Sequence, residues 1–153
     1  MPKQNTHNRP GMTQAANIAG HLEGRDDELL DAMMTAAALV ARADGRIELV
    51  ERDTLVDFMD RYGFLFAFAR TEIVDAFERR LRQFEEHGGA EVAVDSLERF
   101  AGRAPARLVI DVGWQVAAAD GHLHSRELHL LHLIHIALVA PSARSVYYAG
   151  GAR

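Results

Sequence analysis

Two short segments of the chain carry the same acidic residues at the same spacing. Asp44-Gly45 is followed by Glu51 and Asp120-Gly121 by Glu127, each with alanine before the aspartate and an aliphatic residue two positions after the glycine. A pattern that recurs within one chain indicates that the same local geometry is needed twice. Carboxylates at such spacing either satisfy backbone amides or bind hard divalent cations. These four acids are therefore the first candidates for chemistry.

Both glutamates are predicted to point inward from the first turn of a helix. Each falls in the middle of an apolar stripe on a helical wheel. A carboxylate facing a core is costly unless it is hydrogen-bonded, paired with a cation or bound to a metal. The stripes are Leu55, Phe58 and Tyr62 beside Glu51, and Leu131, Ile134 and Leu138 beside Glu127.

Helix capping is the first explanation of these acids. If Glu48 and His124 are N-cap residues, Glu51 and Glu127 stand three positions later and can accept the N-cap amide hydrogen. The two aspartates could likewise accept amide hydrogens inside their turns. This explanation requires no metal.

Metal binding is the second explanation, and it stays open beside the first. Each segment matches the later half of a calcium-binding loop, in which Asp, Gly, an aliphatic residue and Glu are spaced in the same way. The two earlier ligand positions hold Val40 and Arg42 in one copy and Val116 and Ala118 in the other. Neither copy is therefore a complete loop, and a metal site would have to be shared between them.

Such a shared site would suit Ca, Mn or Mg, with water completing the coordination shell. The candidate ligands are Asp44, Glu51, Asp120 and Glu127, to which His122 and His124 could be added. Imidazole also suits zinc, but His129, His132 and His135 fan out around the wheel, so zinc is less favoured. We expect these three histidines to form a solvated polar flank.

The composition disfavours several other functions. The net charge is −5 and the basic residues are scattered, which disfavours nucleic-acid binding, while the absence of cysteine excludes thiol chemistry. No apolar run reaches the roughly 20 residues of a membrane helix, so we expect a soluble, cytoplasmic protein. No nucleophile or phosphate-loop motif is present, so we expect no enzyme activity. A metal-dependent hydrolase using the acids and His122 is the weaker alternative.

Apolar spacing predicts an all-α protein, a compact bundle of about six or seven helices built from two pseudo-twofold repeats of helix, Asp-Gly turn and helix. We expect one domain at 24–141, preceded by a mobile arm at 1–23 and followed by a flexible tail at 142–153. Phe64–Phe68 is expected to plug the core as a connection, and Trp114 to lie in the core. The predicted helices are 26–43, 48–62, 71–87, 90–101, 104–119 and 124–139.

The segment Ala-Leu-Val-Ala-Arg-Ala-Asp-Gly-Arg-Ile before Glu51, and Val-Ala-Ala-Ala-Asp-Gly-His-Leu before Glu127, resembles the TerB tellurite-resistance family. The resemblance extends over about 26–139. It implies an all-helical domain with an acidic, divalent-metal-binding site that includes Asp44, Glu51, Asp120 and Glu127. His122 and His124 depart from the acidic or small polar residues usual in that turn, which puts calcium-like selectivity in that half in doubt.

The resemblance also implies a biological setting. We expect a bacterial, non-enzymatic module of a tellurite or oxidative type of stress response, cytoplasmic or peripheral at the inner membrane. Its partners would be proteins, among them membrane-associated stress-response or chaperone components, and homo-oligomers are open. The alternative is a purely structural protein-interaction domain in which the acids are helix caps and no metal is bound.

Overall fold

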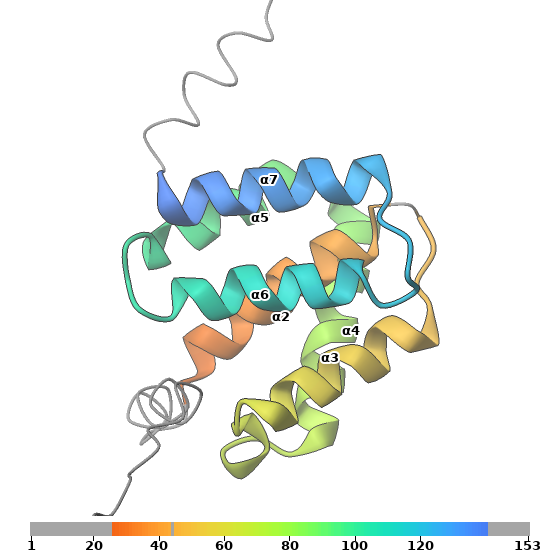
Figure 1. The fold of residues 1–153 in the computed structure, drawn as a ribbon, viewed down its shortest axis with the longest axis vertical. Coiled ribbons are helices and arrows are strands. Elements are labelled where there is room, and N and C mark those ends of the chain that lie inside the picture. The colour runs from red at the N-terminus through yellow and green to blue at the C-terminus, as the bar shows by residue number, and fades with distance from the viewer. Residues whose placement is uncertain (1–25, 44, 141–153) are drawn as a thin grey trace, which may run out of the picture.

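The computed structural model describes residues 26–43 and 45–140, and this part of the chain is helical without a strand (Figure 1). The all-α prediction is confirmed, with helix ends within a few residues of those expected. The predicted arm at 1–23 and tail at 142–153 lie outside the described residues. The helices are α2 (Asp27–Ala41), α3 (Leu49–Arg61), α4 (Arg70–His87), α5 (Ala90–Leu97), α6 (Ala106–Ala117) and α7 (Ser125–Val139), with 3-10 turns η1 (Phe64–Phe66) and η2 (Glu98–Phe100).

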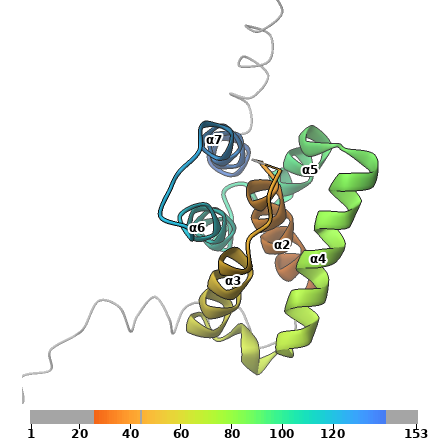
Figure 2. The ribbon, with the colours of Figure 1, turned by 90° about the vertical axis from the view of Figure 1, so that its right-hand side faces the viewer.

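Helix α2 lies at the centre of the bundle, with the other helices around it (Figure 2). The Asp26 carboxylate caps it by accepting the amide hydrogen of Leu29 at 2.9 Å. All of its residues from Leu29 to Ala41 are buried except Asp31. A helix that is apolar nearly all round must be enclosed on several sides. Its main neighbours are α6 and α4.

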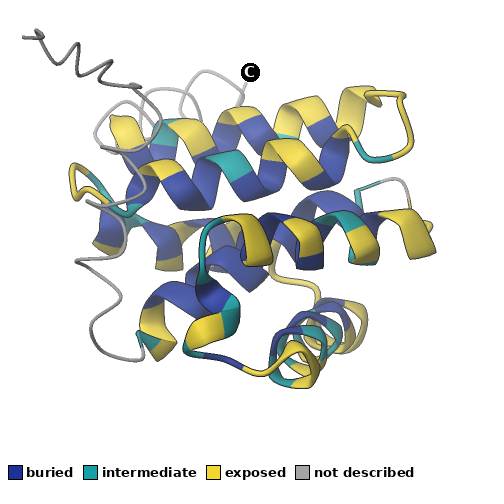
Figure 3. Cartoon of the chain, turned by 60° about the horizontal axis from the view of Figure 1, so that its bottom comes forward, coloured by how far each residue is buried: buried dark blue, intermediate teal, exposed yellow. Residues whose placement is uncertain are grey.

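One hydrophobic core extends across all six α-helices, with exposed residues facing outward (Figure 3). Helix α6 approaches α2 and α7 closely at Gly113. A Cβ atom there would lie 3.2 Å from Leu131 Cδ2 and 3.7 Å from Val40 Cγ2. The small residue therefore sets the spacing between these three helices.

Helix α4 buries a single stripe formed by Ile73, Phe77, Leu81 and Phe84. This stripe packs mainly on α2, so α4 lies at the periphery of the bundle. Helix α5 is shorter than predicted, because the backbone tightens into η2 after Leu97. That tightening keeps the side chain of Phe100 in the core.

Two expectations for aromatic residues had different outcomes. Segment 64–68 connects α3 and α4 through η1, and Phe64 and Phe68 are buried as predicted, whereas Phe66 is 98% exposed. The prediction for Trp114 was wrong, since it is 42% exposed. Helix α6 buries Val109, Val112 and Val116, and Trp114 lies on a different side of that helix.

None of the helices in the described ranges has the length and apolar character required to cross a membrane.

Candidate metal-binding turns

The two Asp-Gly turns have the same backbone geometry in the residues that the structure describes. Gly45 and Gly121 adopt φ values of 78° and 80°, in the left-handed region that glycine enters at little cost. Their amides donate to Arg42 O at 2.9 Å and to Ala118 O at 3.1 Å. Each turn therefore ends one helix, α2 or α6, in the same way. Asp44 itself lies outside the described residues.

The glutamate after each turn hydrogen-bonds the start of the next helix. The Glu48 amide donates to Glu51 Oε2 at 2.7 Å, and the His124 amide donates to Glu127 Oε2 at 2.8 Å. Both N-cap residues have extended backbones, with ψ of 147° and 151°. The predicted reach-back bond of a capping box is thus present in both copies.

Burial distinguishes these glutamates from the other acids. Glu51 is 5% exposed and Glu127 is 3% exposed, and no other charged residue in the described part is buried. Glu72 makes the same bond at the start of α4, to the Ala69 amide at 2.8 Å, but on the exposed surface. The inward direction predicted by the helical wheel is confirmed.

Asp120 and the two histidines of the second turn form a local cluster. Asp120 Oδ1 accepts the His122 amide hydrogen at 2.8 Å, and Oδ2 lies 3.8 Å from His124 Nε2. His122 Nδ1 lies 3.3 Å from the Asp120 carbonyl oxygen. The carboxylate keeps 28% of its side-chain surface exposed. It therefore combines a structural hydrogen bond with access to solvent.

Both turns lie at the same end of the molecule, where α2 leads to α3 and α6 leads to α7 (Figures 1 and 2). Within 26–43 and 45–140, no three His, Asp or Glu side chains gather closely enough to hold a metal ion. The donor chemistry fits a hard cation, since accepting one amide hydrogen leaves a carboxylate with further lone pairs. A cation would also need Asp44 or a local rearrangement of the acids.

Sequence reasoning missed an apolar rim around the two turns. Five of the nine large hydrophobic side chains exposed in the described part lie there. Two signals could have revealed them: Leu49, Val50 and Leu128 lie off the buried stripes of α3 and α7, and Ile47 and Leu123 precede these helices. The histidines 129, 132 and 135 are exposed on α7, as predicted. The apolar rim consists of Ile47, Leu49, Val50, Leu123 and Leu128.

The fold and the paired turns define a small helical domain with two acid-bearing Asp-Gly turns at one end. Residues 30–145 match the family described as tellurite resistance protein TerB, and the chain belongs to this family. The resemblance inferred from the two turns is thereby confirmed. No curated protein and no solved structure matches the chain significantly.

Proposed function

We propose that this TerB-family chain is a non-enzymatic module that binds a divalent cation through the acids of its two turns. The observation that supports this most strongly is the pair of buried glutamates, Glu51 and Glu127, in turns that lie at one end of the molecule. Buried carboxylates tend to be retained where they are hydrogen-bonded or bind metal. Asp44 and Asp120 would complete the acidic set, and His122 or His124 could join it.

The cation would be Ca, Mn or Mg, since carboxylate oxygens suit all three and water can fill the remaining positions. Zinc is less favoured because two imidazoles in a single turn give it few nitrogen ligands. Bound at the shared site, the metal would fix the two turns relative to each other. Cation binding by these acids would thus determine how the two turns are arranged at this end of the module.

In this proposal the module acts in a bacterial stress response of the tellurite or oxidative type. It works in the cytoplasm or at the inner membrane surface, by presenting its turn end to other proteins. The apolar rim supports this role, because exposed apolar side chains gathered in one region favour association. Membrane-associated stress-response or chaperone components, and further copies of the chain, are the partners we propose.

A purely structural interaction domain is the second candidate. Its support is the pair of reach-back bonds at 2.7 and 2.8 Å, which account for both buried glutamates without a cation. The two candidates differ in the role of charge. Capping needs only an acceptor oxygen, whereas a divalent cation needs the negative carboxylate.

Glutamine separates the two roles, since its amide oxygen can still accept the N-cap amide hydrogen. We would measure the melting temperature after chelation and then with added Ca, Mn, Mg or Zn. A cation at 100 times its dissociation constant stabilises the folded state by about 2.7 kcal/mol. The melting temperature of the wild type should therefore rise when the metal is added. The double variant Glu51→Gln, Glu127→Gln should not show this rise.

Glu85→Gln is the matched control, because Glu85 is an exposed glutamate of α4 distant in sequence from both turns. This variant should keep the full metal-dependent rise. A wild type whose melting temperature is the same with chelator and with each metal would exclude the metal proposal and favour the capping domain.

A further inference from the structure

Two adjoining open cavities lie beside the connection from α4 to α5. The smaller lies between this connection, the C-terminal end of α2 and Leu130 of α7, and the larger lies between α2, α4 and α5. The smaller has a volume of about 260 Å³ and the larger about 600 Å³. Phe84, Gly88 and Gly89 line both. Gly88 and Gly89 adopt φ values of 62° and 85°, so the backbone bends sharply where the cavities meet. Together the cavities fall in the size range of small-molecule sites.

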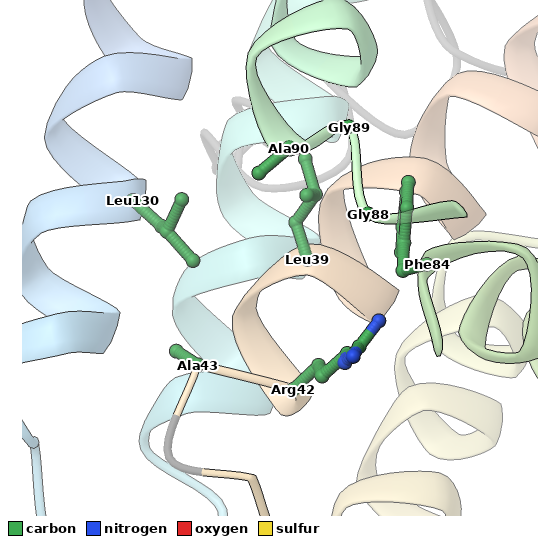
Figure 4. A pocket seen from close by; sticks show the side chains of 8 residues that line it. All are labelled: Leu39, Arg42, Ala43, Phe84, Gly88, Gly89, Ala90 and Leu130. Carbon is green, nitrogen blue, oxygen red and sulfur yellow. The ribbon is translucent and has the colours of Figure 1, made fainter. Parts of the chain in front are cut away.

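The smaller cavity is an apolar slot. Figure 4 shows Leu39 in its centre, with Leu130 on one side and Phe84 on the other. An apolar cavity of about 150 Å³ is already large enough to bind benzene. The slot can therefore hold a short hydrocarbon chain or an aromatic ring.

Among the described residues that line this slot, Arg42 is the one that carries a charge. Its side chain is half-buried and extends toward the Phe84 side (Figure 4). Within 26–43 and 45–140 it has no hydrogen-bond or ion-pair partner. A guanidinium over an apolar surface binds planar anions well, because its fork of donors matches a carboxylate and it sheds water readily.

The larger cavity adds positive charge beside the slot. Arg80 Nε donates to Asp31 Oδ1 at 3.1 Å, and Arg99 Nη2 lies 3.7 Å from Asp31 Oδ2. One carboxylate thus meets two guanidinium groups. The described walls of the two cavities carry three arginines and one acid, although the whole chain has a net charge of −5. An anion is therefore attracted to this part of an otherwise acidic molecule.

We propose that the joined cavities bind a small amphipathic carboxylate. Its short apolar chain lies in the slot between Leu39, Leu130 and Phe84, and its carboxylate pairs with Arg42. A single negative charge is favoured over a phosphate dianion, because only Arg42 lacks a described partner and Asp31 repels a second charge. The slot adjoins the first Asp-Gly turn at Arg42 and Ala43, but it uses none of the proposed metal ligands and does not require a bound metal.

The test is a titration of the isotope-labelled full chain with sodium octanoate, followed by amide NMR in the presence of chelator. Saturable shifts are expected at Leu39, Gly88, Gly89 and Leu130. Acetate lacks the apolar chain and octan-1-ol lacks the charge, so each should bind at least tenfold more weakly. These two probes separate the contributions of the slot and of the arginine.

Arg42→Gln should weaken octanoate binding at least tenfold. Arg79→Gln is the matched control, since Arg79 is exposed on α4 and lines neither cavity, and it should leave the affinity unchanged. Ala90→Leu places a larger side chain at an exposed position of the slot and should also reduce binding. The spectra report at the same time that each variant is folded.

Three results would overturn the proposal. One is the absence of saturable shifts at millimolar octanoate. Another is an equal loss of affinity in Arg42→Gln and Arg79→Gln, and the third is binding of octan-1-ol as tight as that of octanoate.

Discussion

At the scale of single residues, the position of Glu51 and Glu127 on their helices explains why acids occur inside apolar stripes. The third position of a helix lets a glutamate reach back to the N-cap amide, which has no partner within the helix. When that bond is buried, its removal destabilises the protein more, because water cannot replace the missing acceptor. Burial, more than bond length, should therefore determine how much each cap contributes.

Glu127→Ala tests this argument. The substitution removes the acceptor of the His124 amide hydrogen at a site that is 3% exposed, and should destabilise the protein by about 1–3 kcal/mol. Glu127→Gln keeps an acceptor and should cost less. The free energy of unfolding would be obtained from urea denaturation monitored by circular dichroism.

The structure offers a matched control in Glu72, which makes the same 2.8 Å bond on the exposed surface of α4. Glu72→Ala should cost about 1 kcal/mol or less, within the range of ordinary caps. The argument from burial fails if the two alanine variants are equally destabilised.

At the scale of the elements, the spacing of α2, α6 and α7 depends on a residue without a side chain. Gly113 lies where α6 contacts Val40 of α2 and Leu131 of α7. Glycine in a helix interior costs about 1 kcal/mol relative to alanine, so its presence implies a gain from close packing. Because the three helices approach closely at one point, none of them can shift without disturbing the packing of the other two.

Gly113→Leu should therefore destabilise the protein by about 1–3 kcal/mol, because the new side chain must displace Leu131 and Val40 from a packed core. Gly113→Ala should change stability by less, since higher helix propensity offsets a contact that is only slightly too close. Both values would be measured by thermal and urea denaturation.

A double-mutant cycle supplies the control for this prediction. Leu131→Ala creates space next to Gly113, so Gly113→Leu should cost less in that background than in the wild type. Additive free energies for the two substitutions would show that the contact with Leu131 does not set the helix spacing.

At the scale of the whole molecule, the sequence was sufficient for the helices, because nearly every one has a clear stripe and a glycine, proline or cap at its ends. The direction of Glu51 and Glu127 followed from the same periodicity.

Trp114 was misplaced because α6 is apolar on more than one side, so residue type did not identify its buried face. The cavities beside Arg42 could not be predicted, since they arise where α2, α4, α5 and α7 meet. Pairwise packing of distant elements leaves no pattern along the chain.

The continuous core also predicts how the molecule unfolds. Helix α4 makes its main contacts with α2 and α3 and lies at the periphery of the bundle, so it is a candidate for separate unfolding. Its stripe nevertheless belongs to the same hydrophobic cluster as the α6 and α7 residues. Loss of α4 would expose the apolar surface of the central helix α2, so its detachment should destabilise the remaining helices. We therefore expect a single two-state transition, as in most domains below about 150 residues.

Trp114, the single tryptophan, reports on α6 by fluorescence, while circular dichroism reports on all helices. The two urea midpoints should coincide in the wild type. Phe77→Ala in α4 should cost about 3–5 kcal/mol, and Met33→Ala in α2 about 2–5 kcal/mol. Each should move both midpoints by the same amount, because each weakens the one core that all helices share. If Phe77→Ala lowers the dichroism midpoint while the Trp114 midpoint stays, α4 unfolds on its own, and the bundle consists of two cooperative units instead of one.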